Sequence, residues 1–347
     1  MKYQILGRSG MRVSEMCLGA MTFGEEWGLG VDQTESRKVF NLFLDSGGNF
    51  IDTANKYNEG TSEMFLGDFM KGLRNQIVLA TKYTMNMNDQ DPNAGGNHRK
   101  NMVLSVEESL RRLKTDYIDL YWLHMWDYTT PAEEVMRALD DLIRSGKILH
   151  IGASDTPAWI IARSNTFAEL RGWTQFTALQ LKYNLLERTI EREFTEMARE
   201  FNIAVTSWAP LNYGILTGKY SLKDGKLISA DNSKRYSPDQ GGFLDKRKQE
   251  IIQKLRDISE RKNLPMSQIA LAWVRQKGVL PIVGAKTESQ LKENLGYLQH
   301  ELSVIDMSEL EEASKIDLGF PHEFLHRDGI RERIFGDTYT KFDGLKL

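Results

Sequence analysis

The segment NFIDTANKYNEG, residues 49–60, begins as a short apolar run and ends in polar residues. Phe50 and Ile51 are typical of a buried β-strand, whereas Asp52 places a carboxylate at the end of that strand. Tyr57 follows five residues later, among Asn and Gly residues that indicate a loop. Functional groups of α/β proteins gather beyond the carboxyl ends of their parallel strands, so this segment marks a candidate site as well as a strand.

Apolar runs of similar length recur along the chain and predict eight buried strands. The runs are SEMCLGAM (14–21), NFIDT (49–53), IVLATK (77–82), YIDLYWLH (117–124), ILHIGAS (148–154), ALQLKYN (178–184), IAVTSWAP (203–210) and VLPIVGA (279–285). Segments with helical periodicity lie between them, for example 34–47, 101–114, 131–146 and 187–201. In one of these, Pro131 suits the start of a helix and Gly146 suits its C-terminal cap.

Strands that alternate with helices predict a (β/α)8 TIM barrel, with a doubly wound parallel sheet as the alternative. The long interval before the last strand holds an inserted stretch, 212–244, whose Gly, Ser and Asp residues predict a mobile surface loop. No linker divides the chain, so we expect a single domain over residues 1–347. The segment 2–14 is predicted to form a β-hairpin that plugs the bottom of the barrel.

The bulk composition excludes several classes of protein. A net charge of −3 and a pI near 6.1 argue against a nucleic-acid-binding surface. No apolar run approaches the roughly 20 residues that span a bilayer, and the N-terminus lacks the apolar core of a signal peptide. We therefore expect a cytoplasmic protein that binds neither nucleic acid nor membrane. Cys17, the only cysteine, is predicted to pack in the core.

Four polar side chains lie at or just beyond the ends of three successive predicted strands. Asp52 and Tyr57 belong to the second strand, Lys82 ends the third and His124 ends the fourth. Consecutive strands of a barrel are neighbours, so these four side chains are expected to meet at its carboxyl end. Any one of them alone is more often structural; four together indicate a site.

The four side chains together suit carbonyl reduction. A lysine ammonium beside a phenol favours phenolate, so we expect Lys82 to lower the pKa of Tyr57 from its usual value of about 10. That change makes Tyr57 a better general acid near neutral pH. Asp52 is expected to pair with Lys82, and His124 to donate a hydrogen bond to a substrate oxygen.

FIDTANKY, LATKY and DYIDLYWLH resemble the three signature segments of the aldo-keto reductase superfamily, in the same order and at the same spacing. The resemblance covers nearly the whole chain and is strongest to the aryl-alcohol dehydrogenase-like and potassium-channel β-subunit-like branches. It implies a (β/α)8 barrel that uses NADP(H) without a metal. It also implies a catalytic tetrad of Asp52, Tyr57, Lys82 and His124, in which Tyr57 is the acid in reduction and the base in oxidation. His322 and His326 have helical spacing, but we predict no metal site.

The same resemblance implies which residues bind the cofactor. Ser154, Gln180 and Asp155 match the contacts to the nicotinamide carboxamide, although Asp155 stands where the family usually has asparagine. An ionised aspartate accepts a hydrogen bond from the amide but donates none to its oxygen. Trp208 matches the aromatic residue that stacks on the nicotinamide ring. The remaining implied contacts, to the ribose, pyrophosphate and adenosine phosphate, are Met21, Asp52, Ala209, Pro210, Leu211, Gly218, Lys219, Gly284, Lys286, Gln290, Glu293 and Asn294.

Substrate contacts are less specific in the sequence. Trp27 and Trp126 are interpreted as walls of a pocket around Tyr57 and His124, which suits aryl or cyclic carbonyls. The tail, residues 319–347, is predicted to close over that pocket.

We therefore expect an NADPH-dependent reductase of aldehydes or ketones that acts on a small-molecule carbonyl or alcohol. Three alternatives stay open at this point. One is a redox-sensing regulatory subunit that binds NADPH and turns over slowly, and another is a physiological dehydrogenase of alcohols or sugar hydroxyls. The third is a barrel hydrolase that uses His124 and a carboxylate. The sequence also leaves open the exact substrate and whether the chain forms a homo-oligomer.

Overall fold

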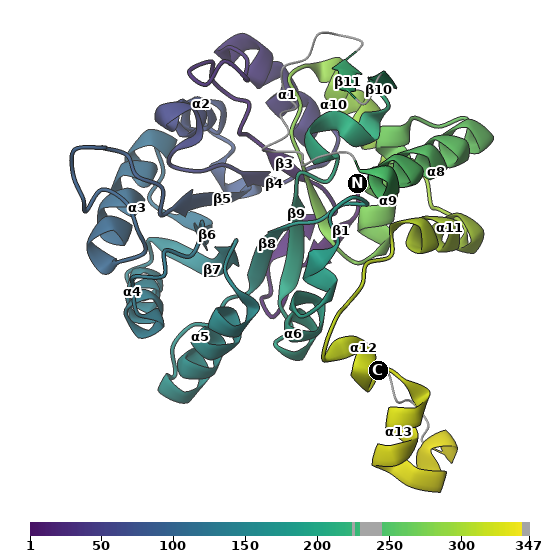
Figure 1. Ribbon diagram of the computed structural model, residues 1–347. Helices are drawn as coiled ribbons and strands as arrows, with labels where there is room; N and C mark the ends of the chain where they lie inside the picture. The colour runs from purple at the N-terminus through teal and green to yellow at the C-terminus, as the bar shows by residue number, and fades with distance from the viewer. Residues whose placement is uncertain (224–225, 230–244, 342–347) are drawn as a thin grey trace.

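The computed structural model describes residues 1–223, 226–229 and 245–341 of the chain. Its centre is a closed barrel of eight parallel strands in the order β12-β3-β4-β5-β6-β7-β8-β9 (Figure 1). The strands are β3 (Cys17–Gly19), β4 (Phe50–Asp52), β5 (Val78–Tyr83), β6 (Ile118–Leu123), β7 (Ile148–Ser154), β8 (Ala178–Lys182), β9 (Ala204–Trp208) and β12 (Leu280–Val283). Each overlaps one of the eight apolar runs, so the predicted (β/α)8 barrel is confirmed and the doubly wound alternative is wrong.

Alternate residues of each strand point into the barrel, and this alternation places the polar side chains. On β6, Leu120 and Trp122 pack in a small apolar cluster inside the barrel. Tyr121 and Leu123 pack in the larger cluster between the strands and the helices. Because successive side chains of a strand alternate between its faces, His124 continues the inner face one residue past the end of β6. The same alternation puts Asp52 and Lys82 on the inner face, at the carboxyl ends of their strands.

An antiparallel hairpin lies at the opposite end of the barrel, as the sequence predicts. Its strands are β1 (Tyr3–Ile5) and β2 (Arg12–Ser14). Leu6 and Val13 are fully buried and belong to the cluster inside the barrel, together with Phe50 and Val78 from the first residues of β4 and β5. The hairpin therefore closes the amino end of the barrel and leaves the carboxyl end for the polar residues.

Helices surround the barrel (Figure 1). They are α1 (Gln33–Asp45), α2 (Thr61–Phe69), α3 (Arg99–Leu113), α4 (Ala132–Arg144), α5 (Ala158–Arg171), α6 (Phe194–Glu200), α8 (Lys246–Lys262), α9 (Met266–Gln276), α10 (Glu288–Leu295) and α11 (Val304–Ser314). Pro131 directly precedes α4, and Gly146 follows its end with a φ of +74°, so both predicted boundaries are confirmed. None of the helices in the described residues is long and apolar enough to cross a membrane.

Two predicted segments differ from the structure. The helix predicted over 187–201 is a 3₁₀-helix, η3 (Thr189–Glu191), followed by α6, because Glu193 between them leaves the helical conformation with a φ of −136°. The described part of the predicted loop 212–244 forms a 3₁₀-helix, η4 (Asn212–Thr217), and a hairpin, β10 (Tyr220–Lys223) with β11 (Lys226–Ser229). Residues 224–225 and 230–244 of that stretch lie outside the described residues.

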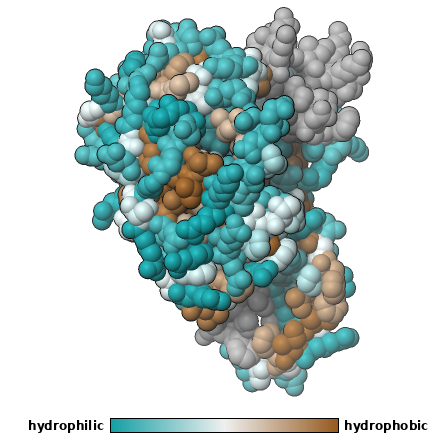
Figure 2. Space-filling view, turned by 90° about the vertical axis from the view of Figure 1, so that its left-hand side faces the viewer, coloured by the Kyte–Doolittle hydropathy of each residue, from teal (hydrophilic) through white to brown (hydrophobic). Residues whose placement is uncertain are grey.

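The C-terminal tail does not close over the barrel, so that prediction is wrong for its described part. Helices α12 (His322–Leu325) and α13 (Asp328–Phe335) project away from the barrel (Figure 1), and in the described chain neither helix buries a residue. Residues 314–317, from which the tail projects, are held by two arginines. Arg247 donates to the carbonyls of Ser314 and Lys315, and Arg192 donates to that of Asp317. Figure 2 shows apolar side chains on this projection, where Phe320 is 85% exposed.

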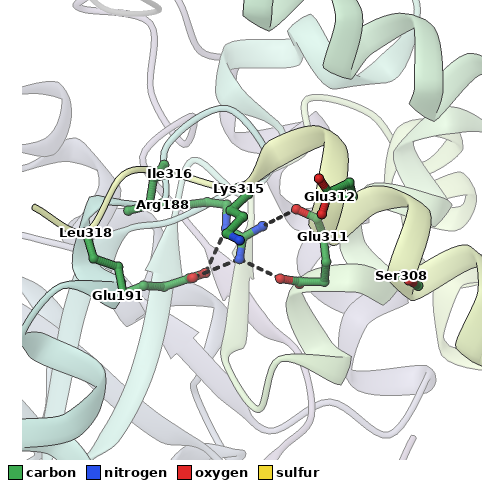
Figure 3. A pocket seen from close by; sticks show the side chains of 8 residues that line it. All are labelled: Arg188, Glu191, Ser308, Glu311, Glu312, Lys315, Ile316 and Leu318. Atoms are coloured by element: carbon green, nitrogen blue, oxygen red, sulfur yellow. Dashed lines mark hydrogen bonds and ion pairs between the residues drawn. The ribbon is translucent and has the colours of Figure 1, made fainter. Parts of the chain in front are cut away.

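Arg188, just before η3, ties the end of β8 to α11. Its side chain is 4% exposed, and its guanidinium contacts the carboxylates of Glu191 and Glu311 (Figure 3). It also donates to the hydroxyl of Ser314. A cavity of about 360 Å³ lies beside this cluster. Its lining residues are Arg188, Glu191, Ser308, Glu311, Glu312, Lys315, Ile316 and Leu318. None of the residues predicted for the active site is among them, so this cavity is separate from that site.

The close packing of Trp122 inside the barrel leaves no room for a side chain at Gly152 on β7. A Cβ added there would lie 2.3 Å from Cζ3 of Trp122 and 2.9 Å from the carbonyl oxygen of Ala178. We expect Gly152→Ala to lower the free energy of unfolding by about 1–3 kcal/mol, because the core must shift to admit the methyl group. Urea unfolding measures the change. Gly10→Ala is the control, because no atom lies within 4 Å of the added carbon. Equal stability of both variants and the wild type would contradict the expectation.

Candidate active site

Lys82 joins two of the other predicted catalytic residues at the carboxyl end of the barrel. Its side chain is fully buried, and its Nζ donates to Oδ2 of Asp52 at 2.5 Å and to the carbonyl oxygen of Thr53 at 2.8 Å. Nζ also lies 3.1 Å from the hydroxyl oxygen of Tyr57. Burial favours the neutral amine, but the negative charge of Asp52 and the contact with Tyr57 raise the pKa of Lys82 above its usual value. Lys82 is therefore held as an ammonium against the phenol.

His124 completes the group. Its ring meets that of Tyr57 edge-on, with 6.0 Å between the ring centroids. Burial and the positive charge of Lys82 hold the pKa of His124 well below its usual range, so the imidazole is neutral at physiological pH. Its Nδ1 is buried and has no hydrogen-bond partner among the described residues. A neutral imidazole beside a phenol and an ammonium suits a hydrogen bond to a carbonyl oxygen.

The pKa of Tyr57 corrects one prediction. The ammonium of Lys82 lowers this pKa, as expected, but desolvation of the hydroxyl and the carboxylates of Asp52 and Asp155 raise it. Desolvation is the largest effect, so the net pKa lies above the usual value instead of below it. Tyr57 is therefore protonated at neutral pH. The site holds a phenol ready to donate a proton, with the cation that would stabilise the resulting phenolate already in place.

The turn after β4 fixes the position of Tyr57. The residue begins a short 3₁₀-helix, η1 (Tyr57–Gly60), in which Asn58 takes a left-handed φ of +47°. The side-chain amide of Asn58 donates to the carbonyl oxygens of Met21 and Phe23, and its Oδ1 accepts from the backbone N–H of Trp27. The loop after β3 is thereby tied to the loop after β4. This connection brings the ring of Trp27 edge-on to Tyr57, with 6.0 Å between the ring centroids.

Strained backbone marks the same end of the barrel. Thr84, Asp155 and Ala209 directly follow the last residues of β5, β7 and β9, and all three have positive φ, of 95°, 37° and 49°. Left-handed backbone is uncommon for residues other than glycine and is an outlier for a β-branched residue such as Thr84. Such strain clusters at functional sites, where the surrounding structure maintains it. It supports the carboxyl end of the barrel as the functional end.

The predicted nicotinamide contacts lie beside the catalytic group, on β7 to β9. Ser154 and Gln180 are buried and face each other in the register of β7 and β8. Nε2 of Gln180 donates to Oδ1 of Asp52 at 2.9 Å, so this residue reaches β4 from β8. Nε1 of Trp208 donates to Oδ1 of Asp155 at 3.0 Å. Gln180 therefore contacts the tetrad directly, Ser154 is its neighbour across the strands, and Trp208 and Asp155 contact each other.

The other predicted cofactor residues follow strands on the same side of the barrel. Met21 follows β3, the segment 209–211 follows β9, and Gly284 and Lys286 follow β12, which pairs with both β3 and β9. Gly218 has a φ of +82°, and Nζ of the adjacent Lys219 lies 5.2 Å from the ring centroid of Tyr220. These residues form an arc along β9, β12 and β3, which are consecutive strands of the barrel.

Helix α10 contributes the last predicted contacts. Thr287 caps its start by accepting from the backbone N–H of Gln290, whose side-chain oxygen accepts from the backbone N–H of Lys286. Glu293 is exposed and accepts from Ser267, whereas Asn294 is buried. Helix α10 therefore begins next to the cationic side chain of Lys286, and the N-terminus of a helix favours a phosphate.

Trp126, the second tryptophan interpreted as a wall of the pocket, has surroundings different from those of Trp27. It is partly buried and packs against the main core, and its backbone N–H donates to the carbonyl oxygen of Asp155. Sequence reasoning missed Lys182, whose Nζ lies 5.5 Å from the ring centroids of both Trp208 and Tyr213. The signal was present, because Lys182 lies two residues after Gln180 and so belongs to the same inward-facing row of β8.

The residues present fit a nicotinamide dinucleotide. Ser154, Gln180 and Asp155 offer a hydroxyl, an amide and a carboxylate that match a carboxamide, and Trp208 offers a ring for stacking. Lys219 and Lys286 carry positive charges on the arc where phosphates would lie. Among the described residues, no three His, Cys, Asp or Glu side chains gather as the ligands of a metal would.

Comparison with known proteins shows which proteins the chain is similar to. Residues 15–315 match the model of the aldo/keto reductase family. A norsolorinic acid reductase of Aspergillus flavus is 39% identical over 93% of this chain and 84% of its own length. An aryl-alcohol dehydrogenase of Pestalotiopsis microspora is 37% identical over 92% and 84%. A protein of Phanerodontia chrysosporium named aryl-alcohol dehydrogenase [NADP(+)] is 34% identical over 98% and 92%. The matched residues contain every predicted catalytic and cofactor-binding side chain.

Proposed function

The chain belongs to the aldo/keto reductase family, and from this premise we propose that it reduces aldehydes or ketones to alcohols with NADPH, reversibly, with Tyr57 as the proton donor. The observation that carries the proposal is the position of the Lys82 ammonium between the carboxylate of Asp52 and the hydroxyl of Tyr57. A phenol whose conjugate base is stabilised in advance is the group that a developing alkoxide requires.

Each residue of the tetrad has one role in this reaction. The bound cofactor supplies a hydride to the carbonyl carbon. The neutral His124 donates a hydrogen bond that orients the carbonyl oxygen toward Tyr57, which gives that oxygen its proton. Lys82 stabilises the phenolate that remains, and Asp52 keeps Lys82 charged and in place. In the reverse direction the phenolate of Tyr57 removes the proton of the alcohol.

We assign the cofactor to the residues that follow β7, β8, β9, β12 and β3, five consecutive strands of the barrel. Ser154, Asp155 and Gln180 would hold its carboxamide, and Trp208 would stack on its nicotinamide ring. Lys286 and the start of α10 favour a phosphate on the adenosine ribose, which is the group that distinguishes NADPH from NADH. The name of the Phanerodontia chrysosporium relative agrees with that preference. The ring of Trp27 beside Tyr57 favours aromatic or cyclic carbonyl substrates.

Steady-state oxidation of NADPH over a panel of aromatic, aliphatic and sugar carbonyls tests the proposal, with NADH in parallel. We expect turnover with NADPH, fastest on aromatic carbonyls. NADPH that binds without turnover on any member of the panel would instead support a redox-sensing subunit. Faster oxidation of the matching alcohols at equal pH would support a physiological dehydrogenase.

The pH dependence of the same assay distinguishes Tyr57 from His124 as the acid. A general acid must be protonated, so the rate of reduction falls as pH rises through the pKa of that acid. The pKa of Tyr57 lies above its usual value. We therefore expect kcat for reduction to stay level through neutral pH and to fall only above about pH 10. If His124 were the acid, the rate would fall as pH rises through values below about 6.5, because the pKa of His124 lies well below that ordinary value. A rate that falls with rising pH in that acidic range would contradict the assignment of Tyr57.

A further inference from the structure

Asp155 holds a carboxylate in the part of the site assigned to the nicotinamide ring. It follows Ser154 at the end of β7, with a left-handed φ of +37°. Its Oδ1 accepts from Nε1 of Trp208 at 3.0 Å. Because this hydrogen bond fixes one carboxylate oxygen against the indole, the negative charge stays beside the ring of Trp208 instead of moving freely in solvent.

The charge of Asp155 acts on both halves of the site. Desolvation raises its pKa, whereas the hydrogen bond from Trp208 and the positive charges of Lys82 and Lys182 lower it. In turn, the carboxylate of Asp155 is one of the groups that raise the pKa of Tyr57. An ionised Asp155 therefore favours the protonated form of Tyr57, which is the form that donates a proton in reduction.

We propose that Asp155 biases the site toward carbonyl reduction, because its negative charge favours the oxidised, positively charged nicotinamide ring over the reduced, neutral ring. The inference rests on the proposed function, since it requires the nicotinamide to lie against Trp208. When the ring gives up a hydride it gains one unit of positive charge, and a nearby carboxylate attracts that charge. A neutral amide in the same place would distinguish the two forms far less.

The test compares the dissociation constants of NADP+ and NADPH in the wild type and in Asp155→Asn, without substrate. Quenching of tryptophan fluorescence reports both. The asparagine keeps the size of the side chain and an acceptor for Trp208, and removes only the charge. Measured at about pH 8, well above the ordinary carboxyl pKa, the ratio Kd(NADP+)/Kd(NADPH) should rise about tenfold in the variant. High salt should reduce the difference, because it screens a charge that solvent reaches.

Two further variants make the result decisive. Asp116→Asn removes the same charge from an exposed residue that precedes β6, at the opposite end of the barrel, and should leave the ratio unchanged. Asp155→Ser removes the charge by a second route, in case the asparagine variant misfolds. A ratio that stays within about twofold of the wild type in both Asp155 variants would overturn the inference and leave the proposed function standing. Failure of the wild type to bind either form would contradict the proposed function itself.

Discussion

Tyr57→Phe should lower kcat for carbonyl reduction by about 10²–10⁴-fold, because it removes the hydroxyl that we propose as the proton donor to the carbonyl oxygen. Among the described residues, the hydroxyl of Tyr57 is the one that Lys82 contacts, at 3.1 Å. The phenylalanine ring keeps the edge-on packing against Trp27 and His124, so the shape of the site is retained. The affinity for NADPH should change little, since Tyr57 is not among the residues assigned to the cofactor.

Measurement of kcat and of the dissociation constant of NADPH on the same preparation separates these two effects. Tyr83→Phe is the matched control, because it removes a buried hydroxyl on β5, from a residue that packs in the outer core and contacts Tyr121. That variant should keep its kcat within about threefold of the wild type, since its hydroxyl contacts no reacting group. Equal losses of kcat in the two variants would show that general damage to the barrel, and not the missing proton donor, is responsible.

Lys82→Met should have the largest effect on stability. Lys82 is fully buried and its ammonium is the counter-charge of Asp52, which is itself 2% exposed. Removal of one partner leaves a buried carboxylate without compensation, which typically costs about 3–5 kcal/mol of the free energy of unfolding. Activity should be lost as well, because Tyr57 no longer has a cation to stabilise its phenolate. Urea unfolding and kcat measure the two losses independently.

The double variant Lys82→Met/Asp52→Asn identifies the cause of the instability. The asparagine carries no charge, so most of the lost stability should return while activity stays low. Lys38→Met is the surface control. Its exposed pair with Glu35 should contribute little to the free energy of unfolding, since water screens it. A Lys82 variant as stable as the surface control would contradict the view that the Asp52–Lys82 pair is an essential buried contact.

The strands of the barrel were predictable because most of their residues are buried on both faces, so that each strand appears as an apolar run in the sequence. The inner position of Asp52, Lys82 and His124 follows from period-two alternation, which the residues themselves specify. Their connection to Tyr57 depends on the left-handed turn at Asn58, which no local pattern indicated. The direction of the Tyr57 pKa was predicted wrongly because desolvation depends on everything packed around the hydroxyl, not on Lys82 alone.

Other misses share that dependence on distant parts of the chain. The hydrogen bond between Trp208 and Asp155 joins residues 53 positions apart, at the ends of two strands, β9 and β7, that are not adjacent. The tail was expected over the pocket, but Arg192 and Arg247, far away in the sequence, direct its root outward. Sequence patterns describe each element well. They do not indicate to which backbone carbonyl a remote arginine donates a hydrogen bond.

The hydrogen bond from Gln180 to Asp52 has a mechanical consequence. In the ring of eight strands, β8 lies diametrically opposite β4, so this hydrogen bond of 2.9 Å connects opposite sides of the barrel across its interior. A distortion that moved β4 and β8 apart would break this hydrogen bond, and the buried amide and carboxylate would each lose a partner. The hydrogen bond thus couples the strand that carries a proposed cofactor contact to the strand that carries Asp52, the anchor of the proposed proton donor.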